Sequence, residues 1–152
     1  MNSTSLPTDR LAALVARKLH VLELLVRLAR QQLALIESED QGRLMSLLSA
    51  KQSLLSQLAE VELQLDPFRA DEPQARLWRT PQARAACRRQ AELGADKLAE
   101  LLELEKEGEI ELVRRRDSVV RLHNVHSAND AGRAYAKCSA GQPCGLALCD
   151  EG

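Results

Sequence analysis

Apolar residues in the first 65 positions recur at steps of three and four, which is the period of an α-helix. One row has seven-residue spacing: Val15, Leu22, Ala29 and Ile36. A second run of the same kind follows: Leu44, Leu47, Leu48, Leu54, Leu55, Leu58, Val61 and Leu65. The pattern predicts helices over residues 8–37 and 40–65.

The stretch between these two runs predicts a very short turn. Ser38 with Gln41 three residues later resembles a capping box, in which the serine starts a new helix. Two helices joined this closely pack antiparallel as a hairpin. One unbroken helix is the alternative, because no proline separates the runs.

A third and longer periodic segment begins at Pro81, after a linker that contains Pro67 and Pro73. Thr80 can cap the first turn, and proline suits the first helical position. The predicted helix covers residues 81–126, on the order of 65 Å at roughly 1.5 Å per residue. Gly108 lies near the point where the shorter hairpin should end, and glycine gives a long helix a place to kink.

Beyond Gly108 the third segment carries apolar residues that the hairpin is too short to cover: Leu112, Val113, Val119, Val120, Leu122 and Val125. A contiguous apolar surface of this kind indicates an external partner. We therefore expect residues 111–126 to be the working surface of the protein and residues 81–104 to be its scaffold.

The composition supports an all-α fold. Leucine and alanine dominate, and the chain has only one Trp, one Tyr and one Phe, so no aromatic core exists for a sheet protein. We expect Phe68 and Trp78 to cover one end of the core. The predicted architecture is an antiparallel helical hairpin plus a long third helix, as a three-helix bundle or coiled coil. Residues 1–7 are expected to be a disordered lead and residues 127–152 a flexible tail.

Charge and hydropathy exclude several classes of protein. The formal net charge of -1 offers no basic surface for nucleic acid. The most apolar region, residues 19–36, is interrupted by charged residues, so we expect no membrane-spanning helix and a cytoplasmic location. No serine–histidine–acid arrangement, phosphate-binding glycine loop or paired-carboxylate site stands out, and we predict no enzymatic activity.

The sharpest chemical candidate is a histidine pair followed by cysteines: His123, His126, Cys138, Cys144 and Cys149. Histidines three residues apart on a helix can share a face, and thiolates bind Zn²⁺. The cysteine spacing is not the tight spacing of zinc knuckles, so we predict no metal and no cofactor. A zinc- or thiol-responsive protein stays open as an alternative.

The hairpin resembles that of FlgN-like flagellar export chaperones. The residues that carry the resemblance are Glu37, Asp40, Leu44, Leu47, Leu48, Lys51, Leu54, Leu55, Leu58 and Glu62. The order of parts is also similar: a linker with Arg76-Leu77-Trp78, a long third helix, and a tail with Asn129 to Arg133. The resemblance covers residues 10–136, and the Cys-containing end has no counterpart in the family.

The resemblance implies a non-catalytic cytoplasmic chaperone. Such proteins hold the hook-filament junction proteins FlgK and FlgL by their C-terminal helices and deliver them to the export gate protein FlhA. By position, the resemblance implies these partner-binding residues: Leu112, Val113, Arg116, Val119, Val120, Leu122 and Tyr135. A coiled coil in which this segment pairs with a second copy, as a homodimer, is the alternative.

Overall fold

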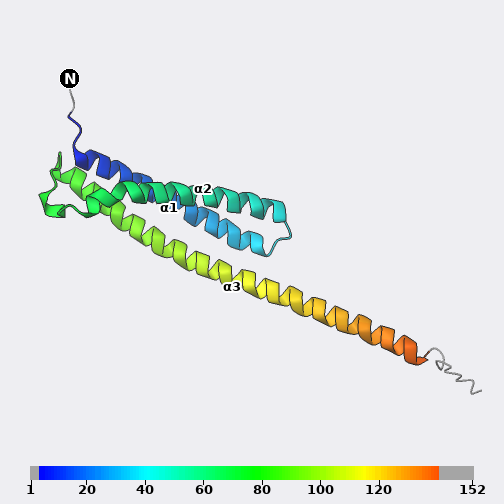
Figure 1. The fold of residues 1–152 in the computed structure, drawn as a ribbon. Coiled ribbons are helices and arrows are strands. Elements are labelled where there is room, and N and C mark those ends of the chain that lie inside the picture. The colour runs from blue at the N-terminus through cyan, green and yellow to red at the C-terminus, as the bar shows by residue number, and fades with distance from the viewer. Residues whose placement is uncertain (1–3, 141–152) are drawn as a thin grey trace, which may run out of the picture. The chain divides into compact units, whose positions relative to one another are not determined.

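The structure is a computed structural model that describes the backbone of residues 4–140 and the side chains of residues 4–133. Three long helices, α1 (Pro7–Ile36), α2 (Gln41–Arg69) and α3 (Pro81–Ala140), are joined with a short 3-10 helix, η1 (Pro73–Ala75) (Figure 1). No strand occurs among residues 4–140. The predicted all-α class is confirmed. The chain divides into two units, residues 1–111 and 112–152.

The helix starts follow local hydrogen bonding. At α1, the Asp9 carboxylate accepts a hydrogen bond of 2.9 Å from the Leu6 backbone N–H. At α2, the Asp40 carboxylate accepts one of 3.0 Å from the Arg43 N–H. The capping role predicted for Ser38 is wrong, because its hydroxyl donates back to the Leu35 carbonyl at the end of α1. Asp40 replaces it, since its carboxylate faces the first free backbone donors of α2.

The predicted hairpin of α1 and α2 is confirmed. Contacts between early α1 and late α2 fix its antiparallel sense: Lys18 Nζ lies 2.6 Å from Glu62 Oε1. Near the other end, Lys51 Nζ donates to Gln32 Oε1 at 2.9 Å. Figure 1 shows the two helices side by side with the short turn between them.

The first part of α3 completes the core of this unit. Near the linker, one buried cluster unites residues of all three helices: Leu11, Leu14, Val61, Leu65 and Cys87. Farther along lies a second cluster: Val21, Leu22, Leu25, Val26, Ala29 and Leu101. Gly94 faces Leu22 and Gly108 faces Leu33, so α3 runs parallel to α1. The prediction that Phe68 and Trp78 cover one end of the core is confirmed, because both pack against the first cluster.

A polar layer follows the second apolar cluster. Lys51 of α2 is only 9% exposed, and it pairs with buried Gln32 of α1 and with the Glu105 carboxylate of α3. Buried polar groups are stable in a core only when they are paired. Each helix therefore contributes one member of this group, and Lys51 pairs with both of the others.

Several predicted boundaries differ from the structure. Residues 4–7 of the predicted lead are held, because the Thr4 carbonyl accepts from Arg79 and Pro7 begins α1. The end of α2 predicted at residue 65 is wrong, since the helix continues to Arg69 with Pro67 in its last turn. Proline there removes a single backbone donor close to the helix end, where unpaired carbonyls are common anyway.

The end of α3 predicted at residue 126 is also wrong, because the helix continues to Ala140. The apolar period is lost after Val125, but that stretch has no proline and includes alanine, a strong helix former. The predicted flexible tail is therefore helical over residues 127–140. Residues 1–3 and 141–152 lie outside the described part of the chain.

The third helix also continues through Gly108, where the sequence predicts a kink. Gly108 is buried, and a Cβ built on it would lie 3.7 Å from Leu33 Cδ2, an ordinary contact distance. The glycine therefore brings α3 close to α1 and leaves room for a methyl group.

Lys51→Met is expected to lower the free energy of unfolding by about 1–3 kcal/mol, because Gln32 loses its hydrogen-bond donor and Glu105 loses its ion-pair partner. Lys97→Met, which removes the more exposed pair of Lys97 with Glu100, should cost less than about 0.5 kcal/mol. Urea unfolding of both variants measures this difference. Equal costs for the two variants would show that the polar layer is not a stabilising contact.

Gly108→Ala is expected to raise the free energy of unfolding by roughly 0.5–1 kcal/mol, because alanine is the better helix former and the site has room. Thermal and urea unfolding of the variant measure the change. A loss of stability would mean that Leu33 cannot accept the added methyl group, and the packing described around Gly108 would be incorrect.

Candidate functional site

The candidate site is the part of α3 that begins at Leu112. Between Leu112 and Arg133 no described residue is buried. Six large apolar side chains in this segment are 41–70% exposed: Leu112, Val113, Val119, Val120, Leu122 and Val125. Apolar side chains repeated in this way along one helix form a surface suited to a partner helix.

Helical geometry divides these residues into separate faces. Leu112, Val119 and Leu122 stand at steps of seven and three, so they lie on one face, which we name the leucine stripe. Val113 and Val120 also stand seven residues apart and form a second face. Consecutive residues are turned by about 100° around a helix, so the second face is distinct from the leucine stripe.

The predicted partner-binding residues therefore do not make one surface. Arg116 lies between the two faces, and its guanidinium is 3.7 Å from the Asp117 carboxylate, with both side chains mostly exposed. Tyr135 lies within α3, but its side chain is outside the described side chains. Sequence reasoning finds the residues and their exposure, but it misses their division into two faces, which the seven-residue spacings already contain.

The histidine–cysteine candidate gains no support from the described residues. His123 and His126 are exposed on α3, Cys138 has no described side chain, and Cys144 and Cys149 lie outside the described residues. Over the described part of the chain, no group of three or more His, Cys, Asp or Glu residues is arranged to hold a metal ion. Burial in the first core cluster raises the pKa of the Cys87 thiol, which keeps it in the unreactive protonated form.

A search of the described helices finds none that is both long and apolar enough to cross a membrane.

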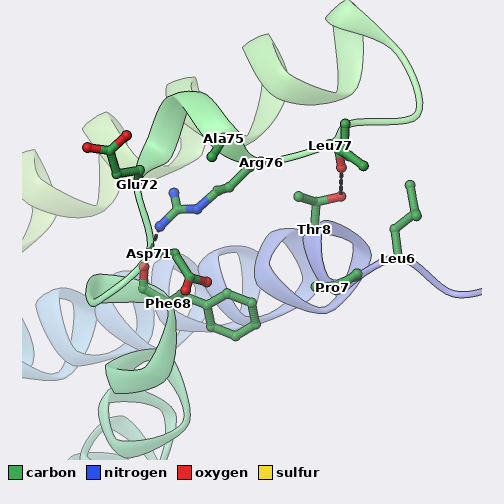
Figure 2. Close-up of a pocket in the computed structure, with 9 residues that line it drawn as sticks. All are labelled: Leu6, Pro7, Thr8, Phe68, Asp71, Glu72, Ala75, Arg76 and Leu77. Carbon is green, nitrogen blue, oxygen red and sulfur yellow. Dashed lines mark hydrogen bonds between the residues drawn. The ribbon is translucent and has the colours of Figure 1, made fainter.

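A pocket of about 350 Å³ lies where the start of α1 meets the linker after α2 (Figure 2). Most of its lining is apolar or backbone: Leu6, Pro7, Thr8, Phe68, Asp71, Glu72, Ala75, Arg76 and Leu77. Arg76 donates to the Phe68 carbonyl, and the Thr8 hydroxyl donates to the Leu77 carbonyl at 2.7 Å. These bonds fasten the linker across the first cluster, so the cationic group of the lining is already engaged in holding the fold.

The same region is closed by an ion pair between Asp9 and Arg79. The guanidinium donates to both carboxylate oxygens, with nitrogen–oxygen distances of 2.8–3.0 Å. The hydrogen bonds from Arg79 and then from the Leu6 N–H lower the pKa of Asp9 below its ordinary value. Folding therefore favours the ionised form of this carboxyl group.

Asp9→Asn is expected to destabilise the protein at neutral pH, and the gap from wild type should close in acid. A carboxyl group whose pKa is lowered by folding contributes stability above its unfolded pKa, about 3.9. That contribution is lost as the pH falls through the lower folded value. Urea unfolding of both proteins between pH 7 and pH 3 measures the gap. A gap that stays constant over this range would contradict a stabilising role for the Asp9 charge.

Comparison with known proteins adds no relative from which a role could be carried over. No protein-family model, curated protein or solved structure matches this chain.

Proposed function

We propose that this protein is a non-catalytic helical chaperone that binds an amphipathic helix of its client along the leucine stripe of α3. The observation that carries the proposal is the exposure of Leu112, Val119 and Leu122 in a segment where no described residue is buried. Leucine and valine at these spacings match helix-in-groove recognition, in which the anchors of two helices interdigitate.

The charge of this segment adds a preference for the client. Residues 112–121 contain four arginines and one aspartate. Arg115 is three residues after Leu112, which places it on the same side of the helix as the leucine stripe. Arg116 lies at the edge of the stripe. A client helix with acidic residues beside its apolar face would be steered to this surface and held in one register. Binding would cover apolar side chains of the client and so prevent its premature self-association.

The identity of the client comes from the resemblance of the hairpin to FlgN-like chaperones. On that basis we propose a cytoplasmic role in flagellar type III export, with the C-terminal helices of FlgK- or FlgL-like junction proteins as clients. Delivery to an FlhA-like export gate is part of the same proposal, and Tyr135 is the candidate gate contact. The order of hairpin, linker and long helix is compatible with such a chaperone.

The double variant Val119→Asp/Leu122→Asp is expected to weaken binding of a junction-protein C-terminal peptide by at least about 100-fold. Each buried valine or leucine contributes roughly 1.5–3 kcal/mol, and the variant replaces both with charges. Isothermal titration calorimetry measures the affinity, and circular dichroism checks that the helices persist.

Val120→Asp is the matched control. Val120 is a valine next to Val119 with a similar exposed fraction, 50% against 58%, but it lies on the second face, so its substitution should leave affinity within about threefold of wild type. Binding that survives the double variant would refute the leucine stripe as the client site. Absence of binding by the wild-type chain would refute junction proteins as clients.

A further inference from the structure

A cavity of about 190 Å³ lies among the three helices of the first unit. Its apolar lining comes from all three: Leu11 and Val15 of α1, Leu65 and Phe68 of α2, and Ala91 and Gly94 of α3. All of these residues belong to the first unit, which ends at residue 111. An apolar cavity of roughly 150 Å³ is enough to hold a benzene ring. The cavity therefore has room for one ring or one short aliphatic chain.

The polar part of the lining is basic. It consists of Lys18, Arg69, Arg76 and Gln90, so the described residues that line the cavity include no acidic one. Lys18 Nζ lies 2.6 Å from Glu62 Oε1, and Arg69 pairs with both Glu62 and Asp66. Neighbouring carboxylates thus compensate two of the three positive charges, and Arg76 is the third.

Arg76 is half-buried and forms no ion pair with the described residues. Its Nη2 donates to the Phe68 backbone carbonyl, which is a neutral acceptor (Figure 2). Its Nε is buried and has no hydrogen-bond acceptor in the described chain. Buried charges in proteins are normally paired, because a charge removed from water without an anion costs free energy. A carboxylate beside this guanidinium would compensate the charge and accept charge-assisted hydrogen bonds.

Arg76 and Phe68 also line the larger pocket of Figure 2, but that pocket differs in charge. Its lining includes Asp71 and Glu72, and like charges close together disfavour a bound carboxylate. The smaller cavity instead combines the same guanidinium with two further basic side chains. An anionic ligand is therefore favoured in the smaller cavity.

We propose that the cavity of 190 Å³ binds a short apolar carboxylic acid in its ionised form. The carboxylate accepts hydrogen bonds from the Arg76 guanidinium, whose planar fork matches carboxylate geometry. The hydrocarbon part, with about six carbon atoms at most, lies against Leu11, Leu65 and Ala91. The whole lining precedes Leu112, so the leucine stripe is not part of this site and the proposal does not depend on the chaperone function.

The test uses hexanoate and the full-length protein. Trp78 is the single tryptophan of the chain, and it packs against the first cluster, which contains Leu11 and Leu65. Hexanoate is therefore expected to change the Trp78 fluorescence in a saturable way. Hexanamide has the same chain without the charge, and its dissociation constant is expected to be at least about tenfold higher, because the charge-assisted hydrogen bond is lost.

Arg76→Gln is expected to raise the dissociation constant of hexanoate by at least about tenfold, because the variant removes the compensating charge. Arg84→Gln is the matched control. Arg84 is an exposed arginine of α3 outside the lining, so the loss of its screened surface charge should leave the constant within about twofold of wild type.

Ala91→Leu is a second test that leaves Arg76 and its bond to the Phe68 carbonyl in place. Ala91 is an exposed helix position, so the larger side chain is compatible with folding, but it occupies the space of the ligand. The dissociation constant of hexanoate should rise by at least about tenfold, because the hydrocarbon loses its buried surface. Ala95→Leu, at an exposed alanine outside the lining, should bind as wild type does. Circular dichroism checks that each variant is folded.

Three results would overturn the proposal. They are a wild-type chain with no saturable response to hexanoate, equal dissociation constants for hexanoate and hexanamide, and a constant that is unchanged in either Arg76→Gln or Ala91→Leu. Val119→Asp/Leu122→Asp should bind hexanoate as wild type does, because neither residue lines the cavity. Client binding and hexanoate binding are separate readouts, so the failure of one proposal is distinguishable from the failure of the other.

Discussion

The packing of α3 against the hairpin is the constraint on which the rest of this structure depends. It rests on the two apolar clusters, the polar layer of Gln32, Lys51 and Glu105, and the contact of Gly108 with Leu33. The hairpin helices have 30 and 29 residues, whereas α3 has 60. Gly108 is the last buried residue of α3 among those described, so the apolar side chains that follow have no core to enter.

That lack of buried contacts leaves two separate apolar faces exposed on α3 after Gly108, the leucine stripe and the face of Val113 and Val120. In the proposed function the leucine stripe supplies the anchors for a client helix. Charge also divides α3 into two stretches, because the helix changes from acidic to basic at the junction of Glu111 and Leu112.

The helices and the hairpin can be predicted from the sequence because apolar spacing and helix-capping residues are local signals. One such residue is Thr80, whose hydroxyl accepts a hydrogen bond of 3.0 Å from the Ala83 N–H at the start of α3. The polar layer has no such signal, since the pairing of Gln32 with Lys51 and Glu105 depends on how three helices align. The end of α3 is misplaced from the sequence because the amphipathic period stops well before the helix does. Alanine-containing sequence without proline can continue a helix without that period.

The exposed residues of the candidate site can all be found from the sequence, whereas their arrangement is harder to see. Because Leu112 and Val113 are adjacent in the chain, sequence reasoning assigns them to one surface. On a helix adjacent residues point about 100° apart, and this places them on separate faces.

Amide hydrogen exchange along α3 tests the central claim most directly, namely that this helix is scaffold up to Gly108 and a working surface beyond it. In dilute protein without a client, amides in the buried part of α3 should be protected like those in the core of α1. Amides of residues 112–126 should exchange quickly and become protected when a client helix is added. Uniform protection along the whole of α3 in dilute, client-free protein would contradict the account.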